Sequence, residues 1–212
     1  MPGCPCNSQI FDGLSVSYKR VLWVVIAINA TMFCIELTAG ISSQSMALRA
    51  DALDFLGDSV TYAISLYVIG RSTRYRAAAA LFKGASLALM GCWILGMALY
   101  HVVYLATPDD LIMGSIGTLA FFANLTSALL LLKFRNGDAN VRSVWLCTRN
   151  DAIGNIAVVA AAGAVLLTGT GWPDVLVAAI MAGLFLWSSM QIIRQAISEL
   201  RDAKDERAAT MV

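Results

Sequence analysis

The sequence predicts an all-α integral membrane protein, a bundle of six transmembrane helices with both termini in the cytoplasm. Hydrophobic residues make up 58% of the 212 residues and charged residues only 14%, whereas a soluble domain carries about 25% charged residues. The apolar residues form runs long enough to cross about 30 Å of hydrocarbon. Leu, Ala, Val and Ile dominate these runs without alternating polar residues, which favours helices over a membrane barrel.

The six spans follow one another with short connections. We expect them at 20–41, 47–70, 78–105, 110–133, 142–168 and 174–197. Gly, Pro and Asp punctuate alternate turns, at 41–46, 108–109 and 171–174. We therefore expect a six-helix transmembrane domain over 18–200, between a cytoplasmic N-terminal tail at 1–17 and a short cytoplasmic tail at 201–212. The third span also carries glycines that permit close helix packing, at Gly84, Gly91 and Gly96.

Basic residues set the orientation of the bundle. They gather at the start of the first span, around the loops after the second and fourth spans, and at the end of the sixth span. The opposite loops hold Asp109, Asp110 and Asp174 and almost no basic residue. The positive-inside rule therefore places both termini in the cytoplasm. The polar N-terminus lacks the pattern of a cleavable signal peptide, and we expect a multi-pass protein of the bacterial inner membrane.

Acidic side chains lie inside two of the apolar spans. Asp54 and Asp58 are four residues apart, and Asp51 continues their face of the second span. Cys147 and Asp151 share a face of the fifth span in the same way. A charged side chain in hydrocarbon costs at least about 2.5–3.5 kcal/mol on insertion scales. Several such groups in one place therefore require a partner that offsets this cost, and a bound cation is such a partner.

The two acidic faces lie at a similar depth, because Asp58 and Asp151 each fall about ten residues into their spans. If the faces meet, Asp54, Asp58, Cys147 and Asp151 form a cage of four ligands. Zn²⁺ takes four ligands of these types, and a thiolate favours Zn²⁺ or Cd²⁺ over Mg²⁺ and Ca²⁺. Crowded carboxylates repel one another, so at least one should hold a proton that the metal displaces.

The alternative is that these acids pair with bases inside the membrane and only hold helices together. Arg49 and Arg149 are available for such pairs. Arg149 is two residues from both Cys147 and Asp151, hence on the other face of its helix. The repeated i, i+4 pair on two spans favours the cation site over this structural explanation.

The chain resembles the cation diffusion facilitator family at four motifs. The first span reads N-A-T-M-F-C-I-E-L-T-A-G over 29–40, and the second contains A-D-A-L-D at 50–54. The fourth contains the polar cluster N-L-T-S-A at 124–128, and the fifth D-A-I-G-N at 151–155. Each motif is modest alone, but their order and spacing over 18–200 are specific to this family.

The resemblance implies a secondary transporter, not an enzyme, that exports Zn²⁺ or Cd²⁺ from the cytoplasm by proton antiport and works as a homodimer. It carries the family's metal ligands over to Asp54, Asp58, Cys147 and Asp151. The family usually has His or Asp at the position of Cys147, a departure that bears on metal choice. We expect the chain to lack the family's usual cytosolic metallochaperone-like C-terminal domain, and the membrane helices alone to hold the dimer.

Two alternatives stay open. The same fold could serve Mn²⁺, Fe²⁺, Co²⁺ or Ni²⁺, or the chain could be a non-transporting metal-binding membrane protein that acts as a sensor or partner subunit. No G-x4-G-K-[ST] loop occurs, so ATP is not expected to drive the protein directly. The expected partners are divalent metal ions, protons, the lipid bilayer and a second copy, with no nucleic acid and no permanently bound cofactor.

Five further residues are possible accessory groups: Glu36, Asp51, Asn155, Cys4 and Cys6. Glu36 lies toward the outer end of the first span, where it could relay protons or metal, or bond Arg49 across the short turn. Asn155 extends the stripe of Cys147 and Asp151 and is expected to join helices by hydrogen bonds. Cys4 and Cys6 could capture a soft metal, although two ligands do not fill a zinc site. The alternative is a tail with incidental thiols.

Overall fold

A computed structural model describes residues 15–68, 73–103, 107–136 and 139–210 of the chain, and its regular elements there are all helical. They are α1 (Val16–Ser42), α2 (Met46–Val68), α3 (Thr73–Val103), α4 (Asp110–Leu131), the 3-10 helix η1 (Leu132–Phe134), α5 (Ala139–Thr168) and α6 (Trp172–Thr210). The all-α prediction is confirmed. α6 continues beyond the expected sixth span into the segment at 201–212, as far as Thr210.

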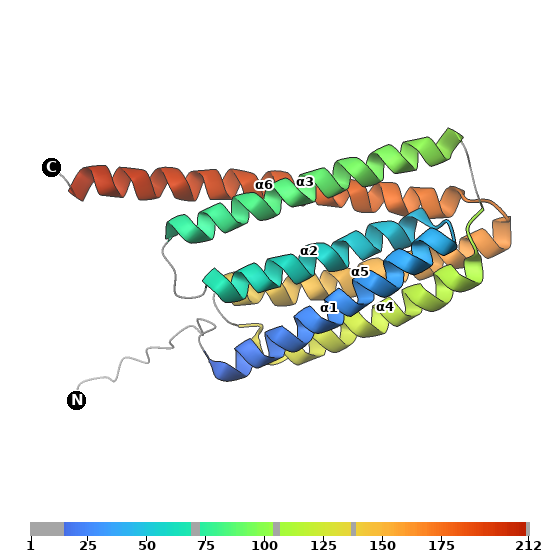
Figure 1. The fold of residues 1–212 in the computed structure, drawn as a ribbon, viewed down its shortest axis with the longest axis horizontal. Coiled ribbons are helices and arrows are strands. Elements are labelled where there is room, and N and C mark those ends of the chain that lie inside the picture. The colour runs from blue at the N-terminus through green and yellow to red at the C-terminus, as the bar shows by residue number, and fades with distance from the viewer. Residues whose placement is uncertain (1–14, 69–72, 104–106, 137–138, 211–212) are drawn as a thin grey trace, which may run out of the picture.

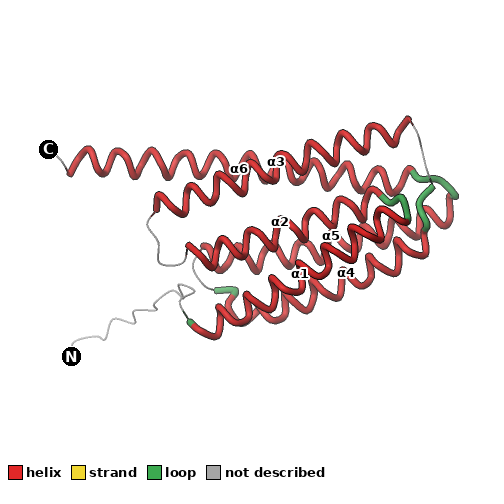
Figure 2. The backbone as a smooth tube through the Cα atoms, in the orientation of Figure 1, coloured by secondary structure: helices red, strands yellow, loops and turns green. Residues whose placement is uncertain are grey.

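The helices form two groups (Figure 1). α1, α2, α4 and α5 make a bundle, and α3 packs along α6 beside it, in contact with α2. α1 begins and α6 ends at the same end of the molecule. Figure 2 shows the described loops after α1, α3 and α5 gathered at the opposite end. The acidic loops thus lie together, away from the basic helix ends, as the positive-inside rule requires of a chain with cytoplasmic termini.

Within the described residues, five helices are long and apolar enough to cross a membrane: α1, α3, α4, α5 and α6. α2 is long enough at 23 residues, but any 18-residue stretch of it contains at least three charged residues. Its acids point into the bundle, where the other helices shield them from lipid. Large apolar side chains face outward, for example Leu89 and Leu167, which are 74% and 86% exposed. The molecule is therefore a six-helix membrane bundle, as predicted.

Asp174, near the start of α6, caps the N-terminus of α2. Its Oδ1 accepts hydrogen bonds from Ser45 Oγ at 2.6 Å and from the Ala47 N–H at 3.0 Å, and its Oδ2 accepts from the Met46 N–H at 2.6 Å. Ser45 Oγ in turn accepts from the Leu48 N–H at 3.1 Å. Unpaired N–H groups at the start of a helix favour a negative charge. We call this contact the Asp174 clamp, and it fastens α6 to α2 at the outer end.

Two glycines let α3 and α6 approach closely. A Cβ atom added at Gly84 would lie 2.6 Å from Ile193, and one added at Gly91 would lie 2.9 Å from Leu186. The carbonyl oxygen of Gly84 also accepts a hydrogen bond from Ser189 Oγ at 2.7 Å. The predicted role in helix packing is confirmed for both, and the contact lies within one chain. The third glycine, Gly96, would have no heavy atom within 4 Å of an added Cβ.

Candidate metal site

The four predicted ligands lie on two neighbouring helices of the bundle, Asp54 and Asp58 on α2 and Cys147 and Asp151 on α5. The carboxyl group of Asp151 lies within electrostatic reach of those of Asp54 and Asp58, and its Oδ2 has no hydrogen-bond partner in the described part of the chain. The Cys147 thiol lies within electrostatic reach of both α2 carboxyls. The i, i+4 spacing thus places the two acidic faces opposite each other.

This arrangement suits protons as well as cations. Two ionised carboxylates both accept hydrogen bonds and donate none, so a bond between them requires a shared proton. Among the described residues, no three His, Cys, Asp or Glu side chains converge closely enough to hold a metal ion. A four-ligand cage would therefore require these side chains to draw together, and the charge of a dication favours that movement because it removes the repulsion between carboxylates.

Tyr62 was not singled out from the sequence, yet it holds Asp58 in place. Its hydroxyl donates to Asp58 Oδ2 and lies 2.9 Å from the Thr148 hydroxyl on α5. Tyr62 and Thr148 are both fully buried. The Thr148 hydroxyl also donates to the carbonyl oxygen of Val144 at 3.1 Å, so the two hydroxyls belong to one polar network between α2 and α5. The only hint in the sequence is that Tyr62 follows Asp58 by four residues.

The two arginines offered as partners for the acids are engaged elsewhere. Arg49 donates its Nε–H to the carbonyl oxygen of Gly40 at 3.0 Å. Arg149 is exposed, donates to the Asn150 side chain at 3.0 Å and lies 5.3 Å over the ring of Trp145. The structural alternative, in which these arginines neutralise the membrane acids, is therefore not what the structure shows.

A second acidic pair lies toward the outer end of the bundle. Glu36 on α1 and Asp51 on α2 are 0% and 1% exposed. Their carboxyl groups lie within electrostatic reach of each other, and neither oxygen of Glu36 has a hydrogen-bond partner in the described part of the chain. Asp54 is within electrostatic reach of Glu36. Glu36 thus faces Asp51, rather than bonding Arg49 across the turn. The acids form a series from the ligand positions toward the outside.

Buried amides complete the polar interior. Asn29 and Asn155 are 0% exposed, and in the described part of the chain their side-chain amides have no hydrogen-bond partner. The expectation that Asn155 joins helices by hydrogen bonds is therefore not met. Buried polar atoms normally have partners, and those without one indicate a place for water or an ion. Cys4 and Cys6 lie outside the described residues.

The described residues thus form a six-helix, multi-pass membrane bundle with a polar, acid-lined interior. Comparison with known proteins agrees with this class. The family pattern described as the cation efflux transmembrane domain matches residues 22–201. The chain belongs to this family, as the motifs of the first, second, fourth and fifth spans predicted.

Several characterised relatives resemble most of the chain. The metal cation efflux system protein CzcD of Cupriavidus metallidurans is 27% identical over 79% of this chain and 57% of its own length. The cadmium, cobalt and zinc/H(+)-K(+) antiporter of Bacillus subtilis is 25% identical over 89% of this chain and 65% of its own length. The zinc transporter ZitB of Escherichia coli is 24% identical over 86% of this chain and 62% of its own length.

These matches also indicate in which membrane the protein resides and how much of its relatives' length the chain covers. With its apolar helices and bacterial relatives, the chain is a multi-pass protein of the bacterial inner membrane. The chain spans about three-fifths of the length of these relatives, from 57% to 65%.

Proposed function

We propose that this protein is a secondary transporter, not an enzyme, that moves Zn²⁺ or Cd²⁺ out of the cytoplasm in exchange for protons. The metal is held by Asp54, Asp58, Cys147 and Asp151. The observation that carries this proposal is that the acidic faces of α2 and α5 lie opposite each other. The printed names of relatives, which include zinc and cadmium, support the same choice of metal.

Proton exchange follows from the chemistry of the ligands. Metal binding requires ionised carboxylates and a thiolate, so protons leave as the ion arrives. On the outer side, protons compete the metal off the same groups. Glu36 and Asp51 are placed to receive those protons or the departing ion, because they lie between the ligands and the outer end.

The proposed assembly is a homodimer held by the membrane helices. Gly and Ala faces on the third span could supply close packing between copies, but Gly84 and Gly91 pack against α6 within the chain. The dimer contact therefore involves other outward-facing apolar surfaces.

One alternative function differs from this proposal in the metal that is carried, and the other in that no metal is carried at all. Mn²⁺, Fe²⁺, Co²⁺ or Ni²⁺ could occupy the same ligands, and the name of one relative includes cobalt. A sensor or partner subunit would bind metal without carrying it. Flux into liposomes separates a carrier from a binder, because a binder shows affinity and no turnover.

The ligand assignment is tested by removing single carboxylates. Asp58→Ala and Asp151→Ala should each abolish metal uptake into inside-out vesicles, because three ligands do not satisfy a site built for four. Both variants should still fold and insert, since neither carboxyl group makes an ion pair within 4.0 Å in the described residues, and its loss leaves no buried base unpaired. Asp110→Ala, at the outer end of α4, is the matched control and should transport normally. Normal uptake by Asp58→Ala or Asp151→Ala would refute the assignment.

A further inference from the structure

Lys83 is a basic residue at the depth of the metal site. It lies ten residues after Thr73, the start of α3, and Asp58 lies ten residues before Val68, the end of α2. These two helix ends adjoin the same loop, so the two side chains stand at a similar level. The apolar part of α3 already begins at Ala80. Lys83 therefore lies within the membrane. Its positive charge alone would group it with the basic residues around the loop between α2 and α3.

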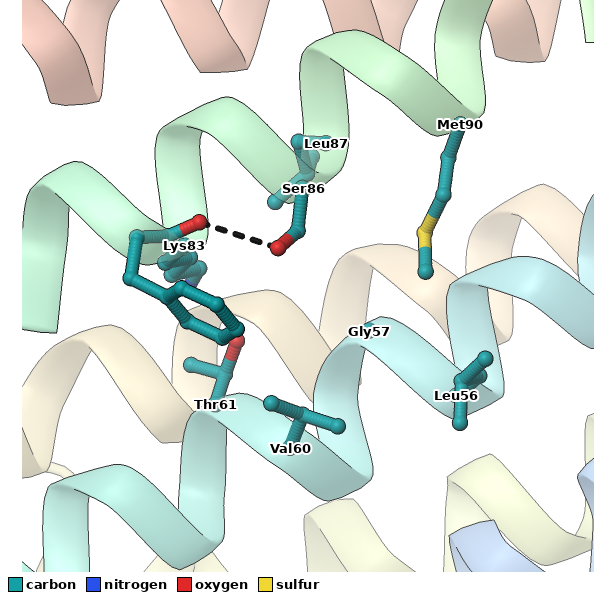
Figure 3. Close-up of a pocket in the computed structure, with 9 residues that line it drawn as sticks. Leu56, Gly57, Val60, Thr61, Lys83, Ser86, Leu87 and Met90 are labelled. Carbon is teal, nitrogen blue, oxygen red and sulfur yellow. Dashed lines mark hydrogen bonds between the residues drawn. The ribbon is translucent and has the colours of Figure 1, made fainter. Parts of the chain in front are cut away.

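A groove separates this lysine from α2. It has a volume of about 120 Å³, and its walls include Gly57, Val60 and Thr61 of α2 and Lys83, Ser86 and Met90 of α3 (Figure 3). Gly57 directly precedes Asp58 in α2. The groove gives the lysine side chain room to change its position beside the site without moving a helix.

The charge of Lys83 reaches three of the four predicted ligands. Its ammonium acts electrostatically on the carboxyl groups of Asp54 and Asp58 and on the Cys147 thiol. Lys83 makes no ion pair within 4.0 Å in the part of the chain that the structure describes, and it is half-buried. An ammonium in apolar surroundings that is near several acids but bonded to none remains free to exchange with another cation.

We propose that Lys83 is a tethered competitor of the transported metal: its ammonium neutralises the acid cluster when the site is empty and withdraws into the α2–α3 groove when a dication binds. This inference rests on the proposed metal transport and concerns the same site. Lys83 is a positioning residue in this scheme, because it acts through the ligands and does not coordinate the ion.

Two consequences follow for a carrier. A conducting site must bind its ion weakly enough to release it, and the repulsion between an ammonium and a dication weakens binding. The empty carrier must also return through the membrane without exposing bare carboxylates to hydrocarbon. A lysine that re-occupies the cluster supplies a counter-charge for that step.

The test compares metal affinity and turnover in purified full-length protein. Lys83→Met and Lys83→Gln remove the charge, Lys83→Arg keeps it, and Lys133→Met removes an equal charge from an exposed position at the cytoplasmic end. Cd²⁺ binding is measured by titration calorimetry in detergent, and Cd²⁺ release is measured as flux in liposomes. We expect about tenfold tighter binding with slower flux for both neutral variants, and values near those of the unchanged protein for Lys83→Arg and Lys133→Met.

The outcomes separate this inference from the transport proposal. If the unchanged protein binds no Cd²⁺, the proposed function itself fails. If it binds and transports Cd²⁺ but the neutral Lys83 variants bind with unchanged or weaker affinity, only the competitor role is overturned. If Lys133→Met tightens binding as much as Lys83→Met, the effect is one of overall charge and the inference is also overturned.

Discussion

The hydroxyl of Tyr62 fixes the direction in which Asp58 can offer its oxygens. Tyr62 is buried, donates to Asp58 and contacts Thr148 across the α2–α5 interface. Hydrogen bonds to charged groups contribute about 1.5–3 kcal/mol. We therefore expect Tyr62→Phe to weaken Zn²⁺ binding by about tenfold and to reduce transport without abolishing it, as measured by calorimetry and vesicle uptake.

The control for this variant is Tyr67→Phe, one turn further along α2, where the ring is 69% exposed. That change should leave binding and transport unaltered. Wild-type affinity in Tyr62→Phe would mean that Asp58 is oriented by its neighbours on α5 and not by the tyrosine.

Cys147 is expected to tune the choice of metal. It is half-buried on α5, within reach of Asp54 and Asp58. Cys147→Asp replaces a soft ligand by a hard one, so Cd²⁺ transport should fall relative to Mn²⁺ or Fe²⁺. Cys147→His should keep Zn²⁺ transport. Competition between metals in a flux assay gives the ranking, with Cys92→Ser, at an exposed thiol of α3, as the control. An unchanged ranking in both variants would show that Cys147 only packs.

Some residues of the candidate site can be recognised from the sequence alone, and others cannot. Asp54, Asp58, Cys147 and Asp151 are conspicuous because acids are expensive in hydrocarbon and recur at helical spacing. Tyr62 is not conspicuous in the sequence, because aromatic residues in membrane helices usually pack against apolar neighbours. Its contact with Thr148 also joins residues 86 positions apart. Lys83 is grouped with a loop by its charge, and only the packing of α3 on α2 shows its depth.

At the scale of the helices, the Asp174 clamp makes one element depend on another. Asp174→Asn keeps the shape of the side chain but removes its charge and one acceptor position for the two N–H groups and the Ser45 hydroxyl. We expect a loss of stability of about 1–2 kcal/mol, seen as a lower midpoint of thermal unfolding in mild detergent. Asp110→Asn makes the same exchange on the first turn of α4 and should lower the midpoint by less. Equal midpoints for the two variants would contradict the clamp.

The composition of the sequence predicts the interiors of the helices more reliably than their ends. The six apolar runs predicted the number and order of the elements, because burial in lipid depends on hydropathy alone. The extension of α6 to Thr210 was missed. The segment after 197 is polar, but it is rich in Ala, Glu, Arg and Lys and contains neither Gly nor Pro. Such a sequence favours continued helix outside the membrane.

For the whole molecule, the crowding of acids predicts a coupling between metal and protons. Binding must displace protons from the carboxyl cluster and from Cys147, so metal affinity should fall as the pH falls. Acidifying the outer side should accelerate export. A trapped pH dye in proteoliposomes should report proton movement opposite to Zn²⁺. Transport with no opposite proton movement and no response to an imposed pH gradient would indicate a uniporter or channel.

The Asp174 clamp also dictates where the molecule can pivot. While the outer ends of α2 and α6 remain fastened, the α3–α6 pair can swing away from the four-helix bundle only at its cytoplasmic end. α6 has 39 residues, a length of about 58 Å, so a swing of about 5° would displace its far end by about 5 Å. A small rotation about the clamp would thus separate the two groups of helices on one side of the membrane only. Opening of the bundle toward the outside would then require the Asp174 clamp itself to move. Asp174 would therefore affect the motion of the helices as well as their stability.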